Sequence, residues 1–302
     1  MAKRRRNNKG RWWSGLKSRF VEGLPRRQAF YFLGFVAMVG LLAAGVVGMR
    51  RLEAYVLAMP EYQTPVRIEL VGVPPGLETD ANRHMLETVN EYAALDEGSR
   101  LLDDQLTGTI GRRISECGWV RRVVAVEKAF GGTVKVHCEY RKPLAWVMHG
   151  DECYLIDAEC TRLPGEYTPT QIRHTGVLQI VGVGAGPCPP GLVWSGGDIQ
   201  AAVGVIELLD KQPFRPQITG VLVGNYNGRV DRHRPHIELA TDRPGSRIRW
   251  GRAPGQELGL EPTASQKLSL LVGVFTKHHR VDMGMPYVDI RRSPYEVDVP
   301  IE

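Results

Sequence analysis

The sequence predicts an α+β protein in which one membrane-spanning helix precedes two folded regions. Residues 29–49 contain no charged side chain, which indicates a transmembrane helix. Residues 66–142 show apolar periodicities in the order β-α-α-β-β. Residues 143–302 show short strand patterns and two helical patterns, so we predict a mainly antiparallel β domain with helices on one face.

The uncharged run at residues 29–49 has the length of a membrane span. Its 21 residues would extend about 31 Å as a helix, close to the roughly 30 Å of a bilayer's hydrocarbon core. A cleaved signal peptide has a shorter apolar core of about 7–15 residues and a small-residue cleavage site. Ala54 and Ala58 form a poor cleavage site, so the sequence favours an uncleaved anchor.

Positive charge before this run predicts its orientation. Residues 1–28 contain ten Lys or Arg and one acidic residue, which favours a cytoplasmic tail. The linker at 50–65 and the folded regions would then lie outside the cytoplasmic membrane, in the periplasm. The tail contributes 10 − 1 = +9 to the net charge of +6, so the other 274 residues have 6 − 9 = −3. The outer part is not basic, and we expect no nucleic-acid partner.

Small residues recur at every fourth position within the predicted helix. Gly40, Ala44 and Gly48 share one helical face. Such spacing allows another membrane helix to approach closely, although glycine is also common in membrane helices without this role. We predict a helix–helix contact along this face.

The region 66–142 is predicted to form one small domain. Its predicted elements are a strand at 66–70, a helix that Thr79 or Asp80 caps and whose apolar positions run from Met85 to Ala93, a helix at 102–117, and strands at 123–126 and 134–140. Alternation in the last strand places Val134, Val136, Cys138 and Tyr140 on one face, which is the expected core face.

The region 143–302 alternates short strands with two helices. Asp198 is expected to cap the first helix, and Thr263 or Ser265 the second. The predicted strands are bounded by turn residues and lie at 145–148, 153–156, 177–183, 221–223, 228–230, 236–240, 246–250 and 287–291.

The sequence contains no recognisable catalytic or cofactor-binding motif. The glycines at 182, 184 and 186 run into Pro187 instead of a helix, which indicates a loop and no dinucleotide site. His233 and His236 could bind a metal together with Asp231, but their basic neighbours indicate a solvated turn. The five cysteines have no C-x-x-C spacing and assign no disulfide. We expect no enzyme activity, no cofactor and no metal.

Several short motifs, taken in order, resemble one family. A Trp-Val pair opens a strand at Trp119, and the next strand closes with Glu139, Arg141 and Pro143. Two further matches are Y-L-I-D at residues 154–157 and Y-V-D-I-R at residues 287–291. With the membrane helix, this order resembles the FtsQ/DivIB family of bacterial cell-division proteins. The resemblance implies that region 66–142 is a POTRA domain and that region 143–302 is the FtsQ-type β domain.

Two features depart from the family pattern. Cys160 stands where the family usually has glycine, and residues 182–191 are unusually rich in glycine and proline. The matching motif residues are expected to be structural. Trp119 would be a core residue, Glu139 and Arg141 would pair on one strand face, and Pro143 would end the ladder because it has no amide hydrogen.

The resemblance implies a non-catalytic, single-pass protein of the cell-division complex (the divisome). Such a protein would bind coiled-coil membrane proteins of the FtsB and FtsL type and regulate septal peptidoglycan synthesis. Other division proteins would bind the POTRA domain and the transmembrane helix. The alternative is a POTRA-bearing transport or secretion component that binds polypeptides by strand addition. Such components usually contain several POTRA repeats or a membrane barrel, and the sequence shows neither.

The C-terminal residues predict a docking edge. In residues 295–299 apolar and acidic side chains alternate, which predicts a final strand after the one at 287–291. We expect no later segment to pair with its outer edge, and an unpaired edge can receive another chain. The resemblance implies that the FtsB-type partner binds here, with Arg291 as a cationic contact. The predicted partner-binding residues are Asp289, Ile290, Arg291, Tyr295, Val297 and Val299.

Overall fold

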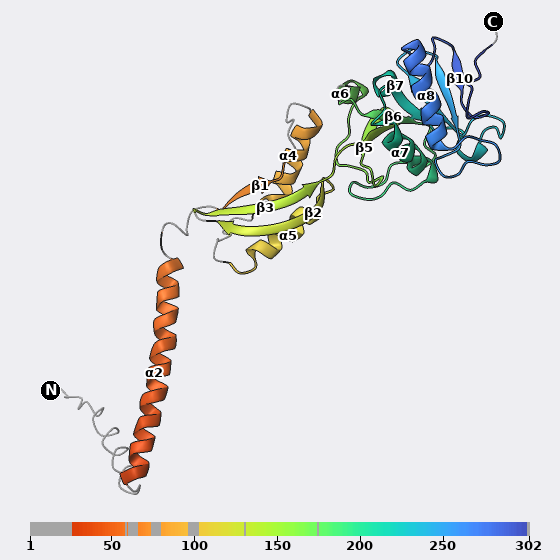
Figure 1. The fold of residues 1–302 in the computed structure, drawn as a ribbon. Helices are drawn as coiled ribbons and strands as arrows, with labels where there is room; N and C mark the ends of the chain where they lie inside the picture. The colour runs from red at the N-terminus through yellow and green to blue at the C-terminus, as the bar shows by residue number, and fades with distance from the viewer. Residues whose placement is uncertain are drawn as a thin grey trace, which may run out of the picture. The chain divides into compact units, whose positions relative to one another are not determined.

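The computed structural model describes residues 26–57, 59, 66–73, 80–95, 103–129, 131–173 and 175–300. The chain forms two compact units, residues 1–64 and residues 65–302. We describe each unit by itself (Figure 1). Of the predicted basic tail (1–28), residues 1–25 lie outside the described residues, as do residues 58 and 60–65 of the predicted linker (50–65).

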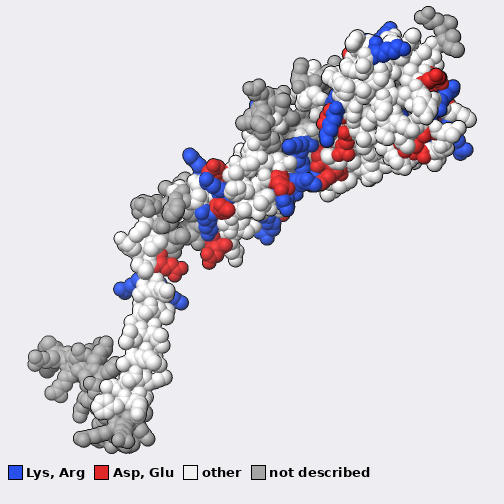
Figure 2. All heavy atoms as spheres, in the orientation of Figure 1, with Lys and Arg blue, Asp and Glu red and all other residues white. Residues whose placement is uncertain are grey.

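The first unit contains the helix α2, Arg26–Leu57. Residues 30–56 of α2 are long and apolar enough to cross a membrane, with a mean hydropathy of 2.3. Figure 2 shows this helix as uncharged over most of its described length, with charged side chains near its C-terminal end. The helix continues to residue 57, so the prediction that a linker begins at residue 50 is wrong. Arg50, Arg51 and Glu53 can extend the helix outside an apolar layer because they are good helix formers.

The second unit begins with a lobe built on a three-stranded sheet, which we call the first lobe. Its elements are β1 (Arg67–Val71), α4 (Asp80–Ala93), α5 (Leu106–Ser115), β2 (Val120–Ala129) and β3 (Thr133–Tyr140). The strand order is β1-β3-β2, with β3 parallel to β1 and antiparallel to β2. The predicted order β-α-α-β-β is confirmed.

The core of the first lobe matches the predicted face of β3. Val134, Val136, Cys138 and Tyr140 are buried, and the indole of Trp119 is fully buried beside them. The same cluster also contains side chains from beyond residue 142. These are Trp146, Cys153, Leu155, Leu163, Tyr167 and Ile172. The first lobe therefore shares its core with the chain that follows it.

The remaining residues form the second lobe, which is built on a seven-stranded sheet of order β10-β9-β8-β7-β6-β4-β5. Its strands are β4 (Ala145–His149), β5 (Glu152–Ile156), β6 (Leu178–Val181), β7 (Ile218–Leu222), β8 (Ile237–Thr241), β9 (Arg247–Gly251) and β10 (Tyr287–Asp289). Its helices are α6 (Pro169–Arg173), α7 (Gly197–Leu209) and α8 (Ala264–His278), with short 3-10 turns η1 (Arg215–Gln217) and η2 (Tyr226–Gly228).

The prediction of a mainly antiparallel sheet is wrong. The pairs β4–β6, β6–β7 and β9–β10 are parallel, and the pairs β4–β5, β7–β8 and β8–β9 are antiparallel. Two of the parallel pairs are joined through α7 and α8, because a chain that crosses over through a helix re-enters the sheet in its original direction. The sheet is mixed.

The prediction that two helices cover one face of this sheet is confirmed for α7 and α8 (Figure 1). The short helix α6 was not predicted, and its Ile172 packs with Trp146 and Leu155 on the opposite face. Side chains of α7 and α8, such as Ile206 and Leu271, are in one buried cluster with Val221, Leu239 and Ile248 of the central strands. Successive strand residues point to opposite faces. The residues that alternate with these core positions therefore lie on the face away from α7 and α8.

Two local predictions in this lobe are wrong. Residues 228–230 are not a strand, because η2 turns the chain there and Asn227 adopts a positive φ of 55°. Asp198 does not cap α7, since the N-cap residue is Gly196. The Asp198 carboxylate instead accepts a hydrogen bond from the Gly184 amide at 2.8 Å and pairs with the guanidinium of Arg229, which follows η2. By contrast, Thr263 caps α8 as predicted, in a capping box with Gln266.

The predicted ion pair at the seam between the lobes is wrong. Glu139 and Arg141 do not pair with each other. Glu139 pairs with Arg122 on the neighbouring strand β2. The Arg141 guanidinium lies 2.6 Å from the buried carboxylate of Asp157 and 2.8 Å from Glu159, both beyond β5. Arg141 therefore links the end of β3 to the turn that follows β5. Residues 141–144, which include Pro143, belong to no strand.

The Asp157 turn also explains the departure at Cys160. Cys160 has a positive φ of 60°, a conformation that glycine adopts without strain. Its side chain is buried in the core of the second lobe, and burial raises the pKa of its thiol to about 11. All five cysteines are free thiols in the structure.

Candidate interaction surface

The strand β10 forms one edge of the seven-stranded sheet. It contains only three residues, Tyr287–Asp289, and pairs with β9 in parallel. Beyond β10 the chain passes through residues 290–294 and returns along its outer side. There Asp298 forms an isolated antiparallel bridge with Asp289, through two backbone hydrogen bonds of 2.7 and 3.0 Å.

The prediction of a final strand at 295–299 is therefore wrong. Within this segment only Asp298 pairs with the sheet, through its bridge to Asp289. Pro294 and Pro300 bracket the segment and remove two amide donors from it. The predicted alternation is present at four positions. Val297 and Val299 pack partly buried against the core, whereas Glu296 and Asp298 are exposed.

The outer side of this segment has free backbone groups. In an antiparallel bridge, the residues on either side of the bonded residue direct their amides and carbonyls outward. Here these are Val297 and Val299, whose backbone groups have no hydrogen-bond partner among the described residues. Tyr295 is 87% exposed. The edge next to Asp298 can therefore accept a further strand.

Asp289 is a buried carboxylate at the centre of a charged group. Its two oxygens accept Nε and Nη2 of Arg291 at 2.9 and 2.7 Å, and Oδ1 also accepts the Arg291 amide. The guanidinium of Arg249 lies 3.6 Å away. Burial alone would raise the pKa of Asp289, but the hydrogen bonds and charge of Arg291, with the charge of Arg249, outweigh it and lower this pKa. Asp289 stays ionised between the two guanidiniums, and the carboxylates of Glu261 and Glu238 also act on Arg291.

The predicted partner-binding residues thus fall into two sets. Asp289 and Ile290 are buried, so they support the surface from within. Arg291 is partly exposed, and Tyr295 is exposed beside the edge. The other predicted sites lie elsewhere. Gly40, Ala44 and Gly48 are exposed on α2, in the first unit.

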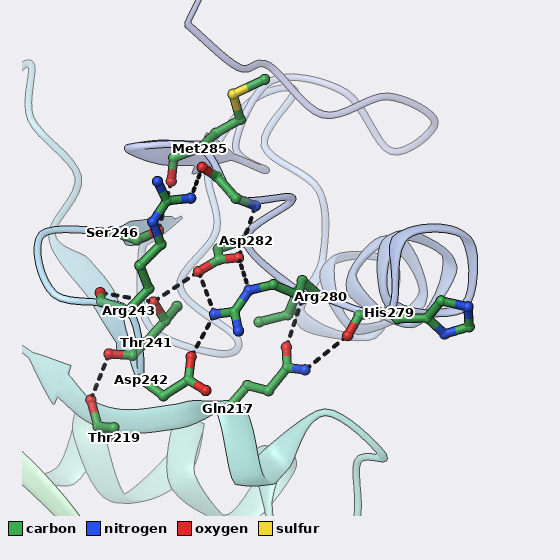
Figure 3. A network of polar contacts seen from close by, with 12 residues as sticks. Gln217, Thr219, Thr241, Asp242, Arg243, Ser246, His279, Arg280, Asp282 and Met285 are labelled. Atoms are coloured by element: carbon green, nitrogen blue, oxygen red, sulfur yellow. Dashed lines mark hydrogen bonds and ion pairs between the residues drawn. The ribbon is translucent and has the colours of Figure 1, made fainter.

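A second buried aspartate fixes the chain that leads into β10 (Figure 3). Asp282 accepts hydrogen bonds from Arg280, from the Thr241 hydroxyl at 3.1 Å and from the Gly284 amide at 3.0 Å. Arg280 also pairs with Asp242 at 2.5 Å. The hydrogen bonds from Arg280 outweigh burial and hold the pKa of Asp282 well below its ordinary value.

This network aligns β10 with β9. The Ser246 hydroxyl donates to the Met285 carbonyl at 2.8 Å, and the Arg247 amide donates to the Pro286 carbonyl at 3.0 Å. Figure 3 shows Ser246 and Met285 near Asp282. The edge strand is therefore held at its start by a polar cluster that sequence analysis did not find.

A basic loop after β7 was also missed as an organised element. The Asn225 side chain accepts the amides of Val230 and Asp231 and donates to the carbonyls of Asp231, Arg234 and Pro235. The loop is thus fixed, and it exposes Val230 among basic residues. Asp231 pairs with Arg234. An Asn-Gly pair in a turn was visible in the sequence, but the reach of the Asn225 side chain over ten residues was not.

Lys267 is a fully buried cation that no periodicity predicted. Its ammonium lies 2.7 Å from Glu261 and over the Trp250 ring at 5.3 Å. Burial lowers the pKa of Lys267, and the hydrogen bond that its ammonium donates to Glu261 opposes this shift. Glu261 also accepts the Arg252 amide, so the pair fastens the loop after β9 to α8. Helical periodicity predicts an apolar residue at such a position, and the partner six residues earlier gives no motif.

No protein-family model matches this sequence, and no curated protein matches it. Among the described residues, no three His, Cys, Asp or Glu side chains are grouped as metal ligands. The Asp231 carboxylate accepts a hydrogen bond from the His233 backbone amide and pairs with Arg234. The chemistry that the described surface offers is backbone pairing at the edge beside β10, next to fixed arginine side chains.

Proposed function

We propose that this chain is a non-catalytic, single-pass membrane protein of the bacterial cell-division complex, of the FtsQ/DivIB type. Its outer part binds coiled-coil partners of the FtsB and FtsL type and so regulates septal peptidoglycan synthesis. The main support is the edge beside β10. There the backbone groups of Val297 and Val299 have no hydrogen-bond partner among the described residues, and Arg291 is bound to Asp289, the bridge partner of Asp298.

The first lobe supports the proposal in a second way. A POTRA domain has the order β-α-α-β-β, and the first lobe has this order with β3 between β1 and β2. Arg141 and Pro143, which carry the resemblance, lie at the seam between this lobe and the next. The helix α2 would anchor the protein in the cytoplasmic membrane, with the N-terminus in the cytoplasm and both lobes in the periplasm.

Co-purification of the FtsB-type protein of the same host tests the docking edge. Val297→Pro removes one outward amide and should abolish capture. Deletion of residues 293–302 should abolish it as well. Val297→Thr is the matched control, because it keeps both the amide and the β-branched shape. If the wild-type chain captures the partner and both variants still capture it, the docking surface lies elsewhere.

Site-resolved hydrogen exchange gives a sharper test of strand addition. In the free protein the Asp298 amide donates to Asp289, whereas those of Val297 and Val299 have no described acceptor. We expect the two valine amides to exchange quickly in the free protein and to become protected in the complex. If the partner protects other amides but leaves those of Val297 and Val299 unprotected, strand addition at this edge is contradicted.

Localisation and topology test the rest of the proposal. A fluorescent fusion should form a band at mid-cell, whereas a uniform envelope signal would favour the alternative of a transport or secretion component. An alkaline phosphatase fusion at the C-terminus should be active. An inactive fusion, together with an active cytoplasmic reporter at the same place, would reverse the predicted orientation.

A further inference from the structure

Three large apolar side chains are exposed on two loops at one end of the seven-stranded sheet. Leu258 and Leu260, in the loop after β9, are 63% and 93% exposed, and Val230, in the loop after β7, is 72% exposed. The first loop leads into Ile237 and the second follows Gly251, and these two residues pair in register. The two loops therefore leave the sheet at the same end.

The loop after β9 holds its two leucines in a fixed turn. The Glu261 amide donates to the Leu258 carbonyl at 3.2 Å, and Gly259 between them has a positive φ of 64°, which glycine adopts without strain. The Glu261 carboxylate accepts a hydrogen bond from the Arg252 amide at 2.8 Å and pairs with the buried Lys267. The turn is thus fastened to β9 and α8, and the leucines project from it into solvent.

Two arginines with unused donors lie at the base of these loops. Within the described chain, Arg232 forms no ion pair or hydrogen bond through its side chain, and the Arg252 guanidinium lies 3.9 Å from Glu261, beyond hydrogen-bond distance. The side chains of Arg232 and His236 both lie next to Gly228. Burial, and then the charge of Arg252, lower the pKa of His236, which places Arg252 in the same neighbourhood. Both guanidiniums can donate to an anion.

The charges of the two loops leave a positive excess. Three ion pairs balance most of them, namely Asp198–Arg229, Asp231–Arg234 and Glu261–Lys267. The charges that remain are those of Arg232 and Arg252 against Glu257, so the sum is 2 − 1 = +1. One oxygen of Glu257 is buried, which turns part of this carboxylate away from the surface.

This arrangement suits a phospholipid layer better than a folded partner. A stable protein interface needs a continuous complementary surface of about 800 Å² on each partner, whereas these apolar side chains stand singly on two loops. A fluid layer accepts separate apolar side chains without matching their shape, and its headgroup phosphates bind guanidiniums.

The anchor helix keeps the second unit close to such a layer. Residues 30–56 of α2 are apolar enough to cross a membrane. The strand β1 begins at Arg67, 67 − 57 = 10 residues after α2 ends at Leu57, and ten residues span at most about 35 Å. A contact that is weak by itself therefore suffices, because the anchor makes it intramolecular and raises the local concentration.

We propose that these two loops bind the surface of an anionic phospholipid bilayer. Leu258, Leu260 and Val230 enter the boundary between headgroups and acyl chains, and Arg232 and Arg252 contact the headgroup phosphates. The contact holds the second lobe against the membrane in which α2 is anchored. This inference rests on the anchor in the proposed function and is independent of the docking edge and its partner.

Fluorescence quenching of the full-length protein in nanodiscs tests the proposal. A fluorophore is attached at Gln256→Cys, in the loop after β9, in a chain that also has Cys188→Ser because the other four thiols are buried. Spin-labelled lipid in discs of phosphatidylglycerol and phosphatidylcholine should quench it. The same fluorophore at Lys277→Cys is the control and should stay unquenched, because α8 returns the chain to the opposite end of the sheet before the parallel strand β10.

Removal of the leucines should release the loops. Leu258→Asn combined with Leu260→Asn should lower the ratio of membrane-bound to free loops at least about tenfold, because two apolar side chains lose their transfer from water. Leu192→Asn combined with Val193→Asn is the matched control. It removes a second exposed apolar pair, at the β5 edge of the sheet, and should leave the quenching unchanged.

The arginines are tested separately. Arg232→Gln should weaken the contact about fivefold in discs that contain phosphatidylglycerol and much less in discs of phosphatidylcholine alone. Equal quenching in both kinds of disc, unchanged by Arg232→Gln, would overturn the contact between the arginines and the anionic headgroups.

The outcomes separate this inference from the proposed function. If α2 inserts into the discs but the fluorophore at position 256 is not quenched, or if quenching persists without the two leucines, this inference is wrong and the docking edge is unaffected. If the leucine variant instead abolishes capture of a coiled-coil partner in detergent, the occupant is a protein and the inference is wrong. Val297→Pro should remove partner capture and leave the quenching unchanged.

Discussion

Asp282 and Asp289 are two buried carboxylates of the second lobe with mirrored surroundings. At Asp282, one guanidinium, that of Arg280, lies between two carboxylates. At Asp289, one carboxylate lies between two guanidiniums, those of Arg249 and Arg291. Each aspartate accepts at least three hydrogen bonds. The two groups differ in their cations: Arg280 donates to both carboxylates of the first group, whereas the guanidinium of Arg249 in the second group donates no hydrogen bond within the described residues.

The two groups also differ in what they connect. Asp282 joins Thr241 and Gly284, and Arg280 extends the group to Asp242, so segments about 40 residues apart are tied together. The hydrogen bonds of Asp289 go to Arg291, two residues later. The first group therefore stabilises the lobe, and the second mainly orients side chains. Burial of a carboxylate therefore does not by itself distinguish a group that ties distant segments together from one that orients nearby side chains.

The largest effect is expected for Asp282→Asn. An amide has a single acceptor oxygen, so in either orientation its NH2 group faces two donors: the Thr241 hydroxyl and Arg280 at the Oδ2 position, or Arg280 and the Gly284 amide at the Oδ1 position. Breaking such a group should lower the free energy of unfolding by about 3 kcal/mol. Urea unfolding of the chain from residue 66 onward measures it. A loss below about 1 kcal/mol would mean that the network in Figure 3 contributes little.

The pH dependence of stability should follow the same residue. The pKa of Asp282 is lowered in the folded protein, mainly by hydrogen bonds from Arg280, so the ionised form is stabilised by folding. This contribution is present above the ordinary aspartate pKa of about 3.9 and is lost as the pH falls below that value. Wild-type stability should therefore drop more steeply than that of Asp282→Asn between pH 5 and roughly pH 2.5. Equal slopes would contradict the assignment.

Asp289→Asn should have a smaller effect on folding. The remaining amide oxygen can still accept Nε and the backbone amide of Arg291, and both arginines can contact water. We expect a loss of about 1–2 kcal/mol in the free energy of unfolding. If this variant is as unstable as Asp282→Asn, the distinction between a structural and an orienting aspartate fails.

The apolar periodicity of the sequence predicted most of the helices and strands, because side chains that share one face of an element are buried together. In β3, alternation identified Val134, Val136 and Cys138 as core residues, and they are buried. Strand pairing was less accessible. The helix at 264–278 stands between β9 and β10, and such a crossover implies a parallel pair, but the many short strands suggested antiparallel hairpins.

The candidate surface was predictable only in part. The edge position of residues 287–289 and the inward valines of the tail follow from local pattern, and both are present. The burial of Asp289 was not predicted, because it depends on Arg249 from another strand. Lys267 likewise depends on Glu261 and Trp250, which become its neighbours only after folding. Long-range charge compensation leaves no periodic signal in a sequence.

The smallest effect on stability is expected for Arg249→Gln, and it is the most informative about the comparison. Arg249 contributes a stacked contact with Tyr287 and a long ion pair at a partly exposed position, which together should be worth about 0.5 kcal/mol. Arg280→Gln should cost clearly more, because it removes the donor that both Asp242 and Asp282 share. Thermal and urea unfolding of the two variants, measured side by side, test this. A small loss in Arg249→Gln beside a larger loss in Arg280→Gln would confirm that Arg249 contributes little to folding. An equal loss in both variants would make Arg249 a structural residue.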